Sequence, residues 1–185
     1  EQAGKSAEGV DAVIVACSNL QRAYPAVSIE VQEALGIDGF AYDMNVACSS
    51  ATFGLQAAVN SVENGSARAV LVVRPEICSG HLNFRDRDSH FIFGDVATGT
   101  VLELAETAKS EHVYDVLSTK ALTKFSNNIR SNFGYMTRAE DVDPYGPDKL
   151  FHQAGRKVFK EVCPLAAAHI EAHLASHDIT PEGVK

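Results

Sequence analysis

Residues 43–64 read DMNVACSSATFGLQAAVNSVEN and place a cysteine, Cys48, between two predicted elements. The preceding residues, Phe40–Val46, have the aromatic and β-branched content typical of a strand. Two serines follow Cys48 and suit the N-terminus of a helix over Ala51–Val62, which the pair Asn64-Gly65 ends. The pattern therefore predicts a strand that leads into a helix, with a cysteine at the junction.

A cysteine at such a junction has a special electrostatic environment. The positive end of the helix dipole and nearby unpaired amide N–H groups both favour thiolate over thiol, so a buried Cys48 could act as a nucleophile. The alternative is a small core residue, which is the usual role of a buried cysteine. The helix also carries small residues that would allow other backbones to pack closely, which predicts a central helix. These residues are Ala51, Gly54, Ala57 and Ala58.

Strand-like and helical patterns alternate on both sides of this junction. Asp11–Ser18 is a continuous apolar run, as expected of a strand buried on both faces. Ala26–Leu35 has apolar residues four apart and is followed by Gly36, which predicts a helix and its end. Ala69–Glu76 and Ala97–Leu104 read as further strands. The alternation predicts an α/β fold around a mainly parallel sheet.

Composition excludes several classes of protein. The 185 residues are 45% hydrophobic and 22% charged, which is typical of a globular chain. A net charge of −8 argues against general nucleic-acid binding and would make an acidic partner depend on a local basic patch. The longest apolar run, Ala12–Cys17, is too short to cross a bilayer, and no signal-peptide pattern follows Glu1. We therefore expect a soluble, cytoplasmic protein without a membrane association.

The four cysteines lie far apart without a CxxC pair, which argues against a disulfide scaffold and a zinc site. His169, His173 and His177 are spaced four apart, so they could form a metal-binding row or simply a polar helix face. No neighbouring Cys or acidic pattern completes a metal site. We expect the polar face, and no metal.

The C-terminal third predicts a second group of elements. His112–Thr119 reads as a strand, and 127–149 as a long surface excursion rich in Asn, Asp, Pro and Gly. Phe151–Ser176 reads as a helix that Pro164 kinks or restarts. Its apolar residues lie four apart and predict a buried stripe. They are Val158, Val162, Ala166, Ile170 and Leu174.

Three motifs, in this order and at this spacing, carry a family resemblance: NVACSSATFGLQAA, AVLVVRPE and FIFGDVATGTVLE. The chain resembles the β-ketoacyl-acyl carrier protein (ACP) synthase III family of the thiolase superfamily. The resemblance implies the layered αβαβα thiolase-like fold, with residues 1–108 in the N-terminal half and 109–185 beginning the C-terminal half. It also implies that the family's chain continues before Glu1 and after Lys185, so we expect a partial chain here.

The chemistry that this resemblance implies is acyl transfer in fatty acid biosynthesis. An acyl group would move from acyl-CoA to Cys48 and then condense with malonyl-ACP with loss of CO2, in a homodimer that needs no cofactor beyond its CoA thioester. The family's catalytic histidine and asparagine would lie beyond Lys185. The string FHQAG at Phe151–Gly155 is similar to the histidine motif but lacks its final Asn, so we do not assign His152 as catalytic.

The resemblance also implies substrate contacts for three residues. Arg87 matches an arginine that packs on the CoA adenine, although 85–88 could equally be a solvated, self-paired turn. Tyr24 matches an aromatic residue that reaches the partner's acyl pocket, or it is a turn aromatic. Phe93 stands in the Phe-Gly-Asp motif. Within that stretch Gly94 and Gly99 predict a tight backbone approach near the catalytic helix.

Two other functions stay open at the level of sequence. A biosynthetic thiolase or a hydroxymethylglutaryl-CoA synthase would use the same cysteine without ACP. A non-catalytic homologue or partner-binding subunit would keep only the fold.

Overall fold

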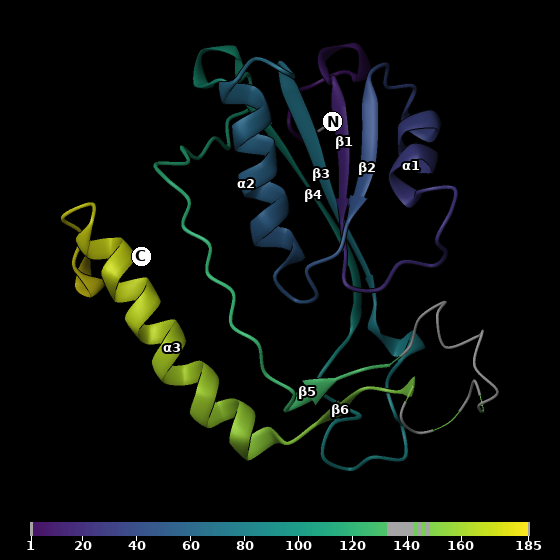
Figure 1. Ribbon diagram of the computed structural model, residues 1–185. Coiled ribbons are helices and arrows are strands. Elements are labelled where there is room, and N and C mark those ends of the chain that lie inside the picture. The colour runs from purple at the N-terminus through teal and green to yellow at the C-terminus, as the bar shows by residue number, and fades with distance from the viewer. Residues whose placement is uncertain (1, 133–142, 144–145, 147–148, 185) are drawn as a thin grey trace. The chain divides into compact units, whose positions relative to one another are not determined.

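The computed structural model describes residues 2–132, 143, 146 and 149–184 (Figure 1). The chain divides into two compact units that interleave along the sequence. Unit 1 comprises Glu1–Gly80 and Phe93–Ala121, and unit 2 comprises His81–Ile92 and Leu122–Lys185. The predicted nucleophile therefore belongs to unit 1, which holds the larger sheet.

Unit 1 is built on a four-stranded mixed sheet with the order β2-β1-β3-β4. The strands β1 and β2 are parallel, as are β1 and β3, whereas β3 and β4 are antiparallel. The predicted α/β fold with a mainly parallel centre is thus confirmed. The strands are β1 (Ala12–Ala16), β2 (Phe40–Met44), β3 (Ala69–Ile77) and β4 (Asp95–Glu103).

Helices α1 (Val27–Leu35) and α2 (Ser50–Glu63) lie on opposite faces of this sheet (Figure 1). Helix α1 ends at Gly36, whose φ of 65° is left-handed, as the sequence predicted. Helix α2 begins one residue before its predicted start and ends at Asn64. Short 3-10 turns occur at Ala7–Gly9, Cys78–Gly80, Ala105–Thr107 and Pro181–Gly183.

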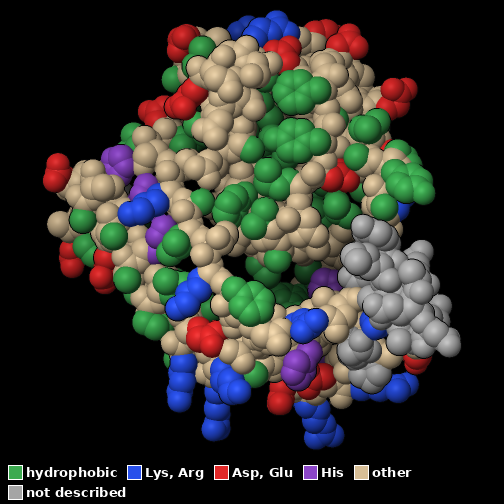
Figure 2. Space-filling model, viewed as in Figure 1, with side chains coloured by type: hydrophobic (Ala, Val, Ile, Leu, Met, Phe, Trp, Pro, Cys, Tyr) green, Lys and Arg blue, Asp and Glu red, His purple; other side chains and the backbone are tan. Residues whose placement is uncertain are grey.

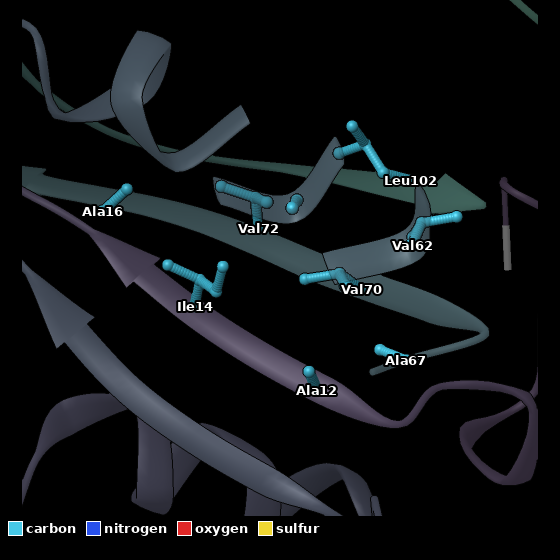
Figure 3. Packing of buried hydrophobic residues seen from close by; sticks show 9 residues of the cluster. Ala12, Ile14, Ala16, Val62, Ala67, Val70, Val72 and Leu102 are labelled. Atoms are coloured by element: carbon cyan, nitrogen blue, oxygen red, sulfur yellow. The ribbon is translucent and has the colours of Figure 1, made fainter. Parts of the chain in front are cut away.

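The core of unit 1 forms on both faces of β1. All five of its residues are buried, which confirms the strand predicted to be covered on both sides. Ile14 packs with Val72 of β3 and Val62 of α2 on one face (Figure 3). Val13 packs with Ile37 on the other. Because side chains alternate along a strand, an uninterrupted apolar run serves both layers.

Two glycines allow close approaches that a side chain would prevent. A Cβ at Gly54 of α2 would lie 2.8 Å from Cβ of Ala16 and 3.2 Å from Val72, which confirms the close packing predicted for this helix. Gly39 has φ of 136°, and a Cβ there would lie 2.0 Å from the carbonyl oxygen of Asp11.

The tight approach predicted at Gly94 and Gly99 is wrong. A Cβ at Gly94 would meet nothing within 4 Å, and one at Gly99 would meet only Leu71, at 3.9 Å. Both glycines are exposed near or within β4, which has a sheet neighbour on one side only. They therefore lie where space is open.

Unit 2 contains a two-stranded antiparallel sheet of β5 (Ile129–Arg130) and β6 (His152–Gln153), followed by helix α3 (Gly155–Ala175). Pro164 lies inside α3, which neither stops nor restarts there. His152 was expected to open this helix, but it lies in β6 opposite Arg130. Much of the predicted excursion at 127–149 lies outside the described residues.

The apolar stripe predicted on α3 is not buried. None of the helix's residues is buried, and Phe159, Val162 and Ile170 are exposed. Figure 2 shows hydrophobic side chains at the surface, among charged ones, where Figure 1 draws α3. Besides this helix, the described part of unit 2 has two short strands and the 3-10 turn Pro181–Gly183, and the stripe stays unburied. The strand predicted at His112–Thr119 is also wrong, since that segment has no regular structure.

Candidate active site

Cys48 lies between the end of β2 and the first residue of α2, as the sequence predicted. Its side chain is exposed rather than buried, like those of Asn45, Ala47 and Ser49 in the same turn. The turn is tight, with an isolated bridge between Val46 and Cys48. An exposed thiol at the N-terminus of a helix is accessible to an electrophile from solvent.

The turn before α2 is held by side-chain hydrogen bonds from both of its ends. Ala47 has a left-handed φ of 48°, and its N–H donates to Oδ1 of Asn45 at 2.9 Å. The buried hydroxyl of Ser50 accepts from the N–H of Val46 at 2.8 Å and donates to the carbonyl of Ala47 at 2.7 Å. These bonds stabilise the left-handed backbone of Ala47, a conformation that is energetically unfavourable for alanine.

The two serines after Cys48 therefore act differently from the predicted capping. Ser49 occupies the N-cap position, but its side chain makes no capping hydrogen bond. The N–H groups of Ser49 and Ser50 donate to the carbonyls of Val46 and Ala47, at 3.1 and 3.0 Å. These two amides are engaged in the turn, so they are not the unpaired donors that the sequence suggested near Cys48.

Three polar residues, Asn45, Ser18 and Glu76, connect this turn to the ends of the neighbouring strands. The sequence reasoning missed this connection. Asn45 Nδ2 donates to the carbonyl of Ser18, two residues after the end of β1, at 3.2 Å. The N–H and Oγ of Ser18 both donate to the carboxylate of Glu76 in β3, at 2.9 and 2.6 Å. The available signal was that polar residues stand where adjacent parallel strands end, which is where sites form in α/β sheets.

Two further cysteines lie at this edge of unit 1. Burial raises the pKa of the Cys17 thiol to about 11, despite a hydrogen bond with the backbone of Asn19 that opposes the shift. Burial also raises the pKa of Cys78, and the charges of Glu76, Asp95 and Cys48 add to this effect. Both environments favour neutral thiols.

Asp95 joins the ends of β3 and β4 in unit 1. Its carboxylate accepts hydrogen bonds from the N–H and the Oγ of Ser79, at 2.9 and 2.5 Å. Both carboxylate oxygens are thereby engaged in holding the hairpin, which is a structural use of this side chain.

The remaining predicted site residues fall in different parts of the chain. Tyr24 lies in unit 1 and is 86% exposed, next to the cis peptide bond that it forms with Pro25. Phe93, at the start of the second segment of unit 1, is half-buried. Arg87 is exposed and belongs to unit 2. The structure thus places Cys48, Tyr24 and Phe93 in one unit and Arg87 in the other.

The turn that carries Arg87 is organised by hydrogen bonds. Asp86 accepts from Ser89 Oγ and from the N–H of Asp88, and these bonds lower the pKa of its carboxyl group, with smaller effects from His152 and His90. Among the described residues no ion pair forms within 85–88, so the turn is not paired through its own charges.

Unit 2 contains an open groove of about 560 Å³. Its lining is polar apart from Phe151 and comprises Asn83, Asp86, Asp88, Arg130, Asn132, Phe151, His152 and Gln153. Within the described ranges, no group of three or more His, Cys, Asp or Glu side chains could hold a metal ion. His173 and His177 instead contact each other edge to face, with ring centroids 5.4 Å apart. No described helix is both long and apolar enough to span a bilayer.

Comparison with solved structures assigns the fold of this chain to a known class of protein. A solved 3-oxoacyl-(acyl-carrier-protein) synthase III is similar over 98% of this chain and 57% of its own, with a TM-score of 0.75 and 25% identity. A hydroxymethylglutaryl-CoA synthase structure with bound CoA is similar over 97% of this chain and 42% of its own, with a TM-score of 0.73 and 18% identity. The protein therefore has the thiolase-like α/β fold.

The sequence comparisons narrow this class to one family. The profile of the 3-oxoacyl-[acyl-carrier-protein (ACP)] synthase III family matches residues 42–121, which include Cys48 and helix α2. A β-ketodecanoyl-[acyl-carrier-protein] synthase of Pseudomonas aeruginosa PAO1 is 61% identical over 185 residues, which are 100% of this chain and 53% of that protein. The chain belongs to the 3-oxoacyl-ACP synthase III family, and it spans about half the length of the curated relatives it matches.

Proposed function

We propose that this chain contributes the acyl-accepting half of a condensing enzyme of fatty acid biosynthesis, with Cys48 as the nucleophile. The observation that carries the proposal is the exposed Cys48 thiol at the start of α2, within the segment that the family profile matches. A thiol in this position can accept an acyl group from a thioester with little change in free energy, because one thioester replaces another.

The first step is acyl transfer from acyl-CoA to Cys48. The Cys48 thiolate attacks the thioester carbonyl, and the backbone N–H of Cys48 donates to the oxyanion of the tetrahedral intermediate. Collapse of this intermediate breaks the bond to the CoA sulfur, which leaves as thiolate and takes up a proton. The product is an acyl thioester on Cys48.

The second step joins this acyl group to a two-carbon unit. Malonyl-ACP loses CO2 to give an enolate, which attacks the acyl carbonyl, and the Cys48 thiolate leaves as β-ketoacyl-ACP forms. The acyl group that we propose has eight carbons, because two further carbons then give the ten-carbon product in the name of the 61% identical relative. The histidine and asparagine that stabilise the enolate in this family are not assigned to any residue of this chain.

Further roles follow from the family and remain part of the proposal. Arg87 would pack on the CoA adenine, while Tyr24 and Phe93 would contribute to the acyl site. Residues 1–108 and 109–185 would belong to the two thiolase-like halves. We also propose a cytoplasmic homodimer without a cofactor, and the four free cysteines are compatible with a reducing compartment.

Single-turnover acylation tests the first step. The 185-residue chain is mixed with octanoyl-CoA that carries a radiolabel in its acyl group, quenched in acid, digested and mapped. We expect stoichiometric label on the peptide that contains Cys48 and none after Cys48→Ala. Cys163→Ala and His152→Ala serve as matched controls that should retain the label. A folded chain that acquires no label, or acquires it on another cysteine, would overturn the assignment of Cys48.

Turnover with malonyl-ACP tests the second step. An enzyme that includes this chain and is as long as its curated relatives should release labelled β-ketodecanoyl-ACP and CO2 in equal amounts. Condensation with acetyl-CoA in place of malonyl-ACP would instead indicate a thiolase or a hydroxymethylglutaryl-CoA synthase.

A further inference from the structure

Glu76 is a half-buried carboxylate near the end of β3, and its hydrogen-bond partners belong to the edge of unit 1 that carries Cys48. Both of its oxygens accept from Ser18, one from the backbone N–H and the other from Oγ. The thiol of Cys78, two residues further along the chain, also lies 4.0 Å from Oε2. The carboxylate thus joins the end of β3 to the end of β1.

From Ser18 the connection continues to the turn of the nucleophile. The carbonyl of Ser18 accepts from Asn45 Nδ2, and Oδ1 of the same amide accepts from the N–H of Ala47. Ala47 is the residue directly before Cys48, and it is held in a left-handed conformation. An unbroken chain of hydrogen bonds therefore runs from Glu76 through Ser18 and Asn45 to the backbone that places Cys48.

The negative charge of Glu76 argues against a role for this residue in activating the thiol of Cys48. A negative charge close to a cysteine disfavours its thiolate, so a carboxylate placed only for electrostatics would hinder acylation. The two donors of Ser18 partly offset this charge, and a hydrogen bond to a charged acceptor is stronger than one between neutral groups. What the carboxylate contributes is a strong, two-point attachment for Ser18.

We propose that Glu76 is a positioning residue of the acylation site, which acts through Ser18 and Asn45 to fix the Ala47–Cys48 turn. The inference rests on the proposed role of Cys48 as the acylated residue. The turn is strained at Ala47, so support from neighbouring strand ends determines whether the nucleophile keeps its position. A displacement of the nucleophile by about 1 Å can reduce the rate of a chemical step roughly a hundredfold.

The experiment compares single-turnover acylation of the 185-residue chain by octanoyl-CoA across a set of variants. Glu76→Ala removes the acceptor, whereas Glu76→Gln removes the charge but keeps an oxygen for the N–H of Ser18. Asn45→Asp breaks the same connection at another link, because a carboxylate can accept from Ala47 but cannot donate to the carbonyl of Ser18. Glu63→Gln, on the exposed end of α2, is the matched charge control.

We expect Glu76→Ala to slow the maximal acylation rate by at least about tenfold, with the half-saturating octanoyl-CoA concentration unchanged within about twofold. Glu76→Gln should recover a substantial part of this loss, and Glu63→Gln should behave as the parent. Since both links act on one turn, Glu76→Ala combined with Asn45→Asp should be little slower than the slower single variant. The inference would be overturned if the rate losses of the two single variants multiplied in the double variant. A Glu76→Ala rate within twofold of the control would overturn it as well.

Alkylation by iodoacetamide separates this inference from the proposed function, because it needs no CoA. Cys48 should be alkylated more slowly in Glu76→Ala than in Glu76→Gln if the turn has lost its support. Cys78, in the 3-10 turn after β3, interacts with Glu76 of β3, Asp95 of β4 and the thiols of Cys17 and Cys48. Its alkylation should accelerate in both Glu76 variants, since each removes a nearby negative charge. Cys78 therefore reports the lost charge, whereas the difference between Glu76→Ala and Glu76→Gln at Cys48 reports the lost support of the turn.

These readouts distinguish the two possible failures. A parent chain whose Cys48 is alkylated but never acylated would contradict the proposed function alone. A parent that is acylated normally, and whose Cys48 reacts identically in all Glu76 variants, would contradict the positioning role alone.

Discussion

Asp43 of β2 caps helix α1 through the backbone of Ser28: its Oδ1 accepts the Ser28 N–H at 2.8 Å, and Oδ2 accepts the neighbouring Val27 N–H at 2.9 Å. The cap comes from a residue 15 positions further along the chain, whereas the local N-cap residue, Ala26, has no side chain that could serve. One carboxylate thereby satisfies two donors at the start of the helix and interacts favourably with its dipole.

We predict that Asp43→Ala lowers the free energy of unfolding by about 1–2 kcal/mol, the usual cost of losing a cap. Chemical denaturation followed by circular dichroism measures this change. Asp38→Ala, at an exposed position in the loop before β2, is the control and should stay within about 0.5 kcal/mol of the parent. Equal effects of the two variants would show that the cap contributes nothing particular.

A second prediction concerns the contact between α2 and the sheet. Gly54→Ala would bring a methyl group to 2.8 Å from Cβ of Ala16, so the helix must shift away from β1 and β3. Overpacking of this kind costs about 1–3 kcal/mol of stability. Gly94→Ala meets nothing within 4 Å and should leave the midpoint of thermal unfolding almost unchanged. A larger loss at Gly94 than at Gly54 would contradict the observed packing.

Stability at acid pH should depend on Asp11. Hydrogen bonds from the Arg68 side chain, and then from its backbone N–H, lower the pKa of Asp11 from 3.8 to about 2. Because the folded-state pKa lies below the unfolded one, the carboxylate stabilises the fold fully above about pH 4, and this contribution is lost as the pH falls towards 2.

Urea unfolding at several values between pH 4.5 and pH 2.5 tests this dependence. Asp11→Asn should reduce the stability most at the upper end and flatten the fall in unfolding free energy towards the lower end. Asp38→Asn should keep the parent's slope. A parallel fall in the parent and in Asp11→Asn would indicate that the pairing with Arg68 contributes no pH dependence.

The cysteines should differ in their reactivity. In brief alkylation at neutral pH we expect Cys48 to react first, because it is exposed at a helix N-terminus, and Cys163 to follow, exposed within α3. Cys78 should be slower, and Cys17 should resist until the chain unfolds, since burial holds its pKa near 11. Peptide mapping at successive times gives the order, and early labelling of Cys17 would contradict the structure.

Local patterns in the sequence were sufficient to predict most of unit 1. Residues 12–16 carry no polar side chain, as expected of a strand covered on both faces, and Gly36 ends α1 through its left-handed backbone. The position of Cys48 followed in the same way, from a strand pattern followed by a helix pattern. Its exposure did not, because exposure depends on which other parts of the chain pack against residues 45–49.

What the sequence could not predict are the connections between elements. The pairing of Glu76 with Ser18 requires β1 and β3 to be neighbours, and periodicity along one strand carries no information about strand order. The stripe on α3 illustrates the opposite error. The sequence correctly showed apolar side chains spaced four residues apart. Burial also requires a facing surface, however, which the described residues do not provide.

The hairpin of β3 and β4 has a consequence for how this chain can be divided. Its two strands pair along nine residues each, yet the segment that joins them, His81–Ile92, belongs to unit 2. A cloning boundary placed after Gly80 would therefore remove an edge strand from the sheet, although it preserves the nucleophile. Fragments cut within 81–92 should instead reassociate when mixed, because the ladder between Ala69–Ile77 and Asp95–Glu103 needs no covalent link to form.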